Sequence, residues 1–154
     1  MLESIRVLQV LDFINYNSGV SAVVTNYFFQ MDPQRVQSDF LLYEMPEEAW
    51  TARLTAAGAK VYATGKPSGR SMAEYERNVK DFFRQHAKDY DIVHVHIPNA
   101  AFIVLRYAKK YGIKVRILHS HNARGADGAV KKIRNYLLNQ WGIHYANRYF
   151  ACSV

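Results

Sequence analysis

The apolar positions of the chain follow two periods in alternation. Short, mostly apolar runs rich in branched side chains predict buried strands at residues 5–11, 36–43, 59–63, 91–97, 114–119 and 148–152. Between them, apolar residues recur every three or four positions and predict helices at residues 20–31, 47–57, 72–86, 98–112 and 130–145. Asp32-Pro33 and Gly112 stand where helices are expected to stop. The pattern therefore indicates strands and helices in strict alternation.

This alternation is typical of an α/β protein with a parallel sheet. We expect a Rossmann-like, doubly wound parallel sheet of about six strands, with helices on both faces and the strand order 3-2-1-4-5-6. A length of 154 residues is that of one domain. Because the last predicted strand runs to the end of the sequence, we expect residues 1–154 to be one domain of a longer protein.

Two local features give finer expectations. Ser71 and Glu74 have the S-x-x-E spacing of a capping box at the start of the third helix. Tyr27, Tyr75 and Tyr145 fall at helix positions that are predicted to face the core, so we interpret them as packing residues rather than as recognition residues.

Composition narrows the class of protein. The chain is 49% apolar and 21% charged, which excludes disordered, collagen-like and low-complexity classes. Its apolar runs are shorter than the roughly 18 residues of a membrane span, and its N-terminus lacks the apolar stretch expected of a signal peptide. The single cysteine, Cys152, cannot form an internal disulfide, so a reducing cytoplasm is the expected compartment.

The net charge of +7 is concentrated in the last third of the chain. Residues 1–102 carry 10 Lys and Arg against 12 Asp and Glu, a net charge of −2, whereas residues 103–154 carry 10 against one, a net charge of +9. Lys131, Lys132 and Arg134 could form a patch that binds a pyrophosphate or the anionic inner face of a membrane. A solvated basic surface without a specific partner, or a nucleic-acid-binding surface, would carry the same charge.

The first candidate for chemistry is the loop Asn17-Ser18-Gly19-Val20, because ligands of open α/β sheets bind beyond the carboxyl ends of the strands. Gly19 can bring the backbone close to a ligand, and the helix that follows offers N–H groups to a phosphate or a sugar hydroxyl. The loop lacks the G-x-G-x-x-G pattern of dinucleotide-binding proteins. Alternatively, Ser18 is an ordinary helix cap.

Two H-x-H pairs, His94/His96 and His119/His121, end the fourth and fifth predicted strands. A spacing of two puts both members of a pair on one face of the sheet. We interpret His94 and His119 as core side chains, and the outer members, His96 and His121, as substrate contacts that donate to a sugar hydroxyl or a phosphate oxygen. All four could instead bind zinc in a metal-dependent hydrolase, although no matching carboxylate or thiolate set accompanies them.

The loops that follow these pairs hold further candidates. Asn99 follows Pro98, and Asn122 and Arg124 follow His121, so we expect these three residues to contact substrate. The sequence contains no G-x-S-x-G elbow, no Walker A motif and no Cys-His nucleophile pair. Covalent catalysis is therefore unsupported.

Four stretches stand in a definite order along the chain. They are the first strand with Asn17-Ser18-Gly19-Val20, the strand Asp91-Ile92-Val93-His94-Val95-His96, the strand Ile117-Leu118-His119-Ser120-His121-Asn122, and Ala146-Asn147-Arg148-Tyr149-Phe150-Ala151-Cys152-Ser153. In this order and spacing they resemble the N-terminal half of a GT-B glycosyltransferase, and most of all the family-4 retaining enzymes that build capsular and exopolysaccharides. The resemblance spans the whole chain.

The resemblance implies that a sugar is transferred, with retention, from a nucleotide-sugar donor to a glycan or lipid-linked acceptor, without an essential metal or other cofactor. By position, His121 matches the active-site histidine that contacts the donor sugar, and Ser18-Gly19 matches the glycine loop that approaches the donor phosphates. Many members have two adjacent glycines at that point. The resemblance further implies an acceptor-side domain that is inactive alone, lacks the nucleotide-binding second domain, and binds no nucleic acid.

Overall fold

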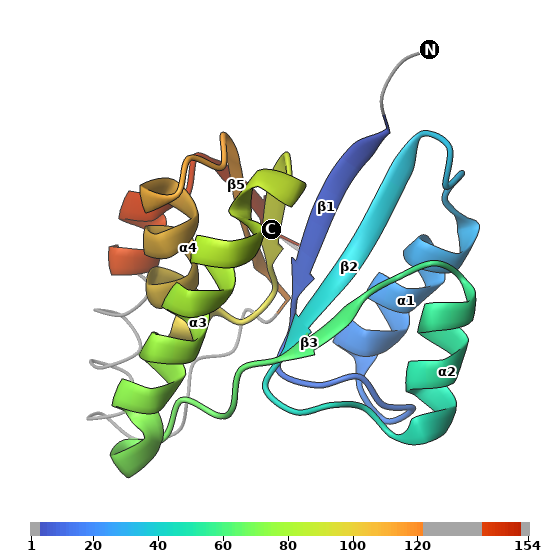
Figure 1. The fold of residues 1–154 in the computed structure, drawn as a ribbon, viewed down its shortest axis with the longest axis horizontal. Helices are drawn as coiled ribbons and strands as arrows, with labels where there is room; N and C mark the ends of the chain where they lie inside the picture. Colours follow the sequence, from blue (N-terminus) through green and yellow to red (C-terminus); the bar gives the residue numbers. More distant parts are fainter. Residues whose placement is uncertain (1–3, 122–139, 152–154) are drawn as a thin grey trace.

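Parallel strands form the centre of the protein (Figure 1). The computed structural model describes residues 4–121 and 140–151. Within these residues, six parallel strands are hydrogen-bonded in the order β3-β2-β1-β4-β5-β6, which confirms the predicted fold class and strand order. They are β1 (Ile5–Val10), β2 (Val36–Leu42), β3 (Val61–Ala63), β4 (Ile92–Val95), β5 (Val115–Ser120) and β6 (Arg148–Ala151).

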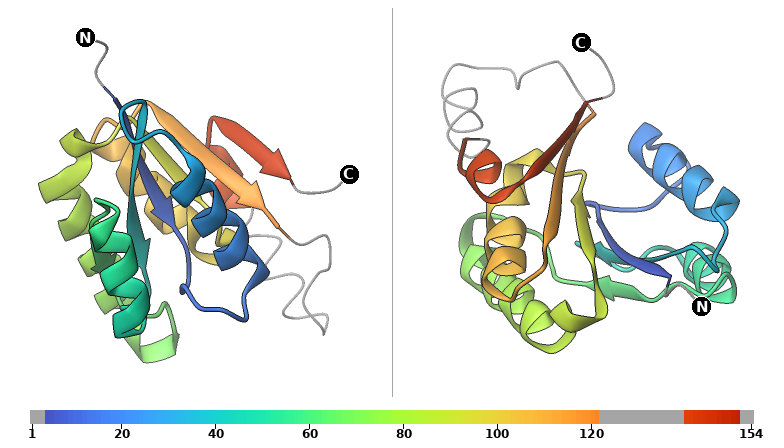
Figure 2. Two further views of the ribbon diagram at one scale, coloured as in Figure 1. Left: turned by 90° about the vertical axis from the view of Figure 1, so that its right-hand side faces the viewer. Right: turned by 90° about the horizontal axis from the view of Figure 1, so that it is seen from above.

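Helices cover the sheet from both sides. Helices α1 (Gly19–Gln30) and α2 (Glu48–Ala56) lie on one side of the strands, and α3 (Met72–His86) and α4 (Ala101–Lys110) lie on the other (Figure 1). Residues 140–145 are helical and pack beside α4, where the ring centroids of Phe102 and Trp141 are 5.7 Å apart (Figure 2). The rest of the helix predicted at residues 130–145 lies outside the described residues. None of the described helices is long and apolar enough to cross a membrane.

The sheet separates two hydrophobic clusters. Successive strand residues point to opposite faces, so Leu8 and Val10 join the cluster under α3 and α4, whereas Phe40 and Leu42 join the cluster under α1 and α2. Burial on both faces explains why the strands are nearly continuous apolar runs in the sequence. Gln9 is paired in register with Phe40 and therefore lies on the α1–α2 side, as a polar side chain in a buried strand.

Two of the finer sequence predictions are wrong. Ser71 stands at the N-cap position of α3, but its side chain makes no capping bond. It ends the tight turn η1 (Gly69–Ser71), where its hydroxyl donates to the carbonyl of Lys66 at 2.8 Å instead. Tyr27 is 65% exposed, because the buried face of α1 runs through Val24 instead.

Candidate active site

The two H-x-H pairs form one cluster at the carboxyl ends of β4 and β5. The ring centroids are 4.1 Å apart for His94 and His96, and 4.0 Å apart for His119 and His121. Between the strands, the centroids of His94 and His119 are 5.2 Å apart, and those of His96 and His121 are 5.0 Å apart. The strand register brings the pairs together, since His94 is paired with Ile117, two residues before His119. These contacts confirm that the four side chains share one face of the sheet.

Hydrogen bonds connect the outer pair to the centre of the sheet. Nδ1 of His96 lies 2.7 Å from Nε2 of His121, and Nε2 of His96 lies 2.9 Å from Oε1 of Gln9. Gln9 reaches the ring because β1 is the neighbour of β4, where Gln9 is paired with His94. His96 is 5% exposed and Gln9 is 8% exposed, so bulk water does not compete for these bonds. His96 is therefore a buried link between Gln9 and His121.

The inner pair has a different environment. Nε2 of His94 lies 3.0 Å from Nδ1 of His119, and the two rings are nearly parallel, at 5°. Phe150 of β6 stands edge-on to both rings, with centroids 5.6 and 5.7 Å away. His94 and His119 are half-buried, so the prediction that the inner members are the core side chains and the outer members lie nearer the surface is wrong for His96. The reason is that the N–H of His96 still bonds to the carbonyl of Val10, at 2.9 Å, which keeps His96 within the sheet.

The environment of the cluster favours neutral imidazoles. Burial is the main cause, and it lowers the pKa of His94 from 6.5 to about 3 and holds the pKa of His96 well below its usual range. Neighbouring histidines add to both shifts, because a charge on one ring disfavours a charge on the next. Burial also lowers the pKa of His119 and of His121. A neutral imidazole has one N–H donor and one acceptor, so each ring can connect one polar partner to the next.

Three of these rings could also hold a metal ion. His94, His96 and His119 each place one ring nitrogen within 4.8 Å of the others. Neutral imidazole is a good ligand for zinc. Within residues 4–121 and 140–151, this group of candidate ligands includes no carboxylate or thiolate, and its members are hydrogen-bonded to other histidines and to Gln9.

The loop after β1 has the geometry of a capped helix start. Oγ of Ser18 accepts a hydrogen bond from the N–H of Ser21 at 3.2 Å, which confirms the alternative that Ser18 is a helix cap. Apart from Gly19 itself, its two chain neighbours and the nearby backbone of α1, no atom lies within 4 Å of the position that a Cβ would take at Gly19. Val20 is half-buried against the cluster under α1 and α2, and Asn17 is exposed. The loop lies at the carboxyl end of β1, the strand beside β4, so substrate contact here stays a prediction.

Several predicted site residues cannot be placed. Asn99 lies in the turn η3 (Pro98–Ala100) beyond β4, but its side chain is outside what the structure describes. The other residues fall within residues 122–139, which also lie outside the described part of the chain; they are Asn122, Arg124, Lys131, Lys132 and Arg134.

Some of the cationic side chains of residues 103–154 form ion pairs or hydrogen bonds that stabilise the fold. Arg106 of α4 forms an ion pair with Glu76 of α3. The guanidinium of Arg116 donates to the carbonyl of Tyr145 at 2.8 Å. Other cations of the described residues remain exposed near the end of α4 and the start of β5; they are Lys109, Lys110 and Lys114.

Sequence reasoning missed two residues of the cluster, Gln9 and Phe150. Gln9 carried a usable signal, because it is an uncharged polar residue within an otherwise mostly apolar predicted strand. Its partner His96 is 87 positions away in the sequence, so only the register of β1 against β4 connects the two. Phe150 carried no such signal, since an aromatic residue in a strand is expected to pack.

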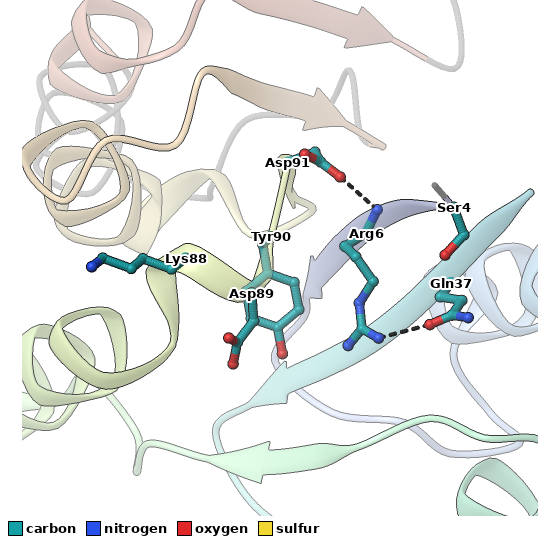
Figure 3. Close-up of a pocket in the computed structure, with 7 residues that line it drawn as sticks. All are labelled: Ser4, Arg6, Gln37, Lys88, Asp89, Tyr90 and Asp91. Atoms are coloured by element: carbon teal, nitrogen blue, oxygen red, sulfur yellow. Dashed lines mark hydrogen bonds between the residues drawn. The ribbon is translucent and has the colours of Figure 1, made fainter. Parts of the chain in front are cut away.

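A polar cavity of about 470 Å³ opens at the other end of the strands, away from the histidine cluster (Figure 3). Arg6 crosses it, donating from its side chain to Oε1 of Gln37 at 2.7 Å and from its backbone N–H to Oδ2 of Asp91 at 2.9 Å. These residues lie at the amino ends of the strands, whereas ligands of such sheets bind at the carboxyl ends. The candidate active site is therefore the histidine cluster. The cavity is lined by Ser4, Arg6, Gln37, Lys88, Asp89, Tyr90 and Asp91.

Comparison with known proteins identifies the family of the chain. The family model described as "Glycosyl transferase 4-like domain" matches residues 18–154. The chain is 28% identical over 148 residues to EpsF of Bacillus subtilis (strain 168), a protein named as a glycosyltransferase, and the match covers 96% of this chain and 38% of EpsF. The fold is similar to that of the lipopolysaccharide outer core galactosyltransferase WaaB in its apo form, with a TM-score of 0.60, 14% identity, and coverage of 94% of this chain and 38% of that one. The chain thus spans well under half the length of both proteins.

Proposed function

Because this chain belongs to the glycosyl transferase 4-like domain family, we propose that it is the N-terminal, acceptor-side domain of a GT-B glycosyltransferase. EpsF and WaaB are both longer than this chain, which covers 38% of each, and this supports a longer protein with a further domain. A second domain that binds the nucleotide would follow. The proposed reaction transfers a sugar, with retention, from a nucleotide-sugar donor to a glycan or lipid-linked acceptor in surface polysaccharide synthesis.

The observation that carries the proposal is the pairing of His121 with buried His96 at the carboxyl end of β5. His121 occupies the position that resembles the active-site histidine of family-4 enzymes. A neutral imidazole held by a buried partner can hydrogen-bond to a hydroxyl of the donor sugar and orient the anomeric carbon. His121 is therefore the proposed catalytic residue.

The loop after β1 would bind the leaving phosphate, on the opposite side of the breaking bond from the donor sugar. In such a transfer, negative charge builds up on the leaving phosphate. The first turn of α1 offers N–H groups and the positive end of the helix dipole to that phosphate. Open space around the Cβ position of Gly19 would let the phosphate approach the backbone. This scheme requires no metal ion, and we propose none.

A metal-dependent hydrolase is the second candidate function. It is favoured by the three ring nitrogens of His94, His96 and His119, which lie within 4.8 Å of one another. Bound zinc would compete with the hydrogen bonds that these rings make, so removing it would change the stability of the protein. Zinc content and stability after chelation therefore separate the two functions.

The test is a turnover screen with nucleotide sugars, run on this chain and on the longer protein in which we propose it lies. We expect the longer protein to release a nucleoside diphosphate and the chain alone to release none. His121→Ala should slow the transfer by about 10²-fold, since the donor sugar is no longer held. His144→Ala, which removes an exposed histidine outside the cluster, is the matched control and should retain activity.

Three outcomes would contradict parts of the proposal. Turnover by the chain alone would contradict the requirement for a second domain. An inverted anomeric centre in the product, read by NMR, would contradict retention. An inactive longer protein that contains stoichiometric zinc, and is destabilised by chelation, would favour the hydrolase.

The charge distribution supports a peripheral position at the anionic inner face of a membrane, where lipid-linked acceptors would lie. Residues 103–154 carry a net charge of +9, and Lys109, Lys110 and Lys114 are exposed. We expect the protein to float with anionic liposomes but not with neutral ones. Equal partitioning to both kinds of vesicle would contradict this position.

A further inference from the structure

The ring of His96 contacts a polar group through each of its nitrogens. Nε2 lies 2.9 Å from Oε1 of Gln9, and Nδ1 lies 2.7 Å from Nε2 of His121. The three residues come from the adjacent strands β1, β4 and β5, or from positions directly after them. His96 is 5% exposed and Gln9 is 8% exposed. Protein groups rather than bulk water therefore decide which nitrogen of His96 carries a proton.

We infer that Gln9 is a positioning residue that determines, through His96, which nitrogen of His121 is protonated. An amide oxygen only accepts hydrogen bonds, so Nε2 of His96 must be the N–H. A neutral imidazole has a single N–H, which makes Nδ1 of His96 an acceptor. This Nδ1 accepts from Nε2–H of His121, and the lone pair of a neutral His121 is then on Nδ1.

The direction of the hydrogen bonds from Gln9 through His96 to His121 depends on a neutral His96. An imidazolium would donate from both nitrogens, so Nε2 of His121 would have to accept, and the hydrogen bond between His96 and His121 would reverse its direction. His96 is 5% exposed and its ring lies 4.1–5.2 Å from three other histidine rings, an environment that disfavours a charged ring and favours the neutral one. Gln9 itself carries no charge that could reverse this effect.

The consequence for recognition rests on the proposed function of His121. With its lone pair on Nδ1, His121 accepts a hydrogen bond from a sugar hydroxyl. The other tautomer would donate from Nδ1–H and would suit a phosphate or carbonyl oxygen instead. Gln9 thus selects what His121 binds, although it acts through the ring of His96.

The first experiment measures the tautomers in the 154-residue chain, by ¹⁵N NMR of the histidine rings at pH 7.5. We expect Nε2 to be the protonated nitrogen in both His96 and His121. A protonated Nδ1 in either residue would overturn the inference. This measurement needs no substitution, so it stands even where a variant fails to fold.

The second experiment removes the acceptor. Gln9→Met keeps the length of the side chain but has no amide oxygen, so the population of the Nε2–H form of His121 should fall below that of the wild type. The matched control is Thr64→Val, at the end of β3, which removes another buried hydrogen-bonding group, 4% exposed and donating to the carbonyl of Leu42 at 3.1 Å. The control should leave the tautomers as they are. Unchanged tautomers in Gln9→Met would overturn the inference.

Activity measurements separate this inference from the proposed function. In the longer protein, Gln9→Met should slow sugar transfer, whereas Thr64→Val should not. If the tautomers follow Gln9 but His121→Ala leaves transfer intact, the proposed function fails and the control of the tautomer stands. If His121→Ala slows transfer as expected but the tautomers are insensitive to Gln9, the inference fails and the proposed function stands.

Discussion

Mild acid should destabilise the protein through His94 and His96. His94 and His96 are neutral in the folded protein at pH 7, because burial lowers the pKa of both below the ordinary value of 6.5. The unfolded chain therefore binds more protons than the folded protein below pH 6.5, and the free energy of unfolding falls as the pH falls. The loss begins near pH 6.5 and, for His94, continues until the folded pKa of about 3.

The size of the effect follows from linkage. Each proton taken up only by the unfolded chain costs about 1.4 kcal/mol per pH unit. Between pH 7.5 and pH 5.5, a histidine that stays neutral in the folded protein loses about 1.4 kcal/mol in total, so His94 and His96 together lose about 3 kcal/mol. Burial also lowers the pKa of His119 and of His121, so both add to the loss in the same direction.

The assay is urea unfolding at pH 7.5, 6.5 and 5.5, followed by far-UV circular dichroism. The double variant His94→Gln, His96→Gln should lose most of the pH dependence, because glutamine does not titrate. Thr64→Val, which lowers stability without removing a histidine, should keep the wild-type dependence. Wild-type stability that is flat across this range would refute the reasoning, and so would a double variant with the full dependence.

Three further predictions concern stability. Asp39→Ala should lower the free energy of unfolding by about 3–5 kcal/mol, because the 3%-exposed carboxylate accepts from Arg6 at 2.9 Å and from Tyr90 at 2.8 Å; a urea midpoint unchanged from wild type would contradict this. Ser18→Ala should cost about 1 kcal/mol by the same assay, since the N–H of Ser21 loses its cap, whereas Ser18→Gly should cost only a few tenths. Chelation with EDTA should leave the thermal midpoint unchanged, and a lower midpoint would instead support the hydrolase.

The strand order could be predicted from the sequence because local patterns and the topology rules agree. Apolar runs of strand length alternate with helical spacing, and Gly58 and Gly112 end helices with φ of +90° and +92°, in the region that favours glycine. The sequence pattern does not predict the hydrogen bond of a side chain that has several possible partners. Ser71 has the right spacing for a capping box, but the preceding turn brings carbonyls close enough to take its hydroxyl.

The meeting of the two H-x-H pairs was likewise predictable, but the depth of each ring was not. A spacing of two, on strands that are neighbours in the expected order, puts all four rings on one face. How deeply each ring lies depends on where the backbone leaves the sheet. His96 stays bonded to Val10 of β1 although β4 ends at Val95, and this long-range contact has no local signal. The role of Gln9 depends on the same register.

The histidine cluster is neutral and is hydrogen-bonded to the amide of Gln9. It is therefore better suited to bind a sugar hydroxyl than to neutralise a phosphate. A carboxylate at position 9 would favour a protonated His96, whereas the amide of Gln9 accepts from the neutral ring. His121 then offers a hydrogen bond but no full charge. Under the proposed function, the charge of the leaving phosphate must be met by the first turn of α1 and by the second domain. This division of tasks gives a physical reason why the chain alone should not turn over: it would hold the sugar without stabilising the leaving group.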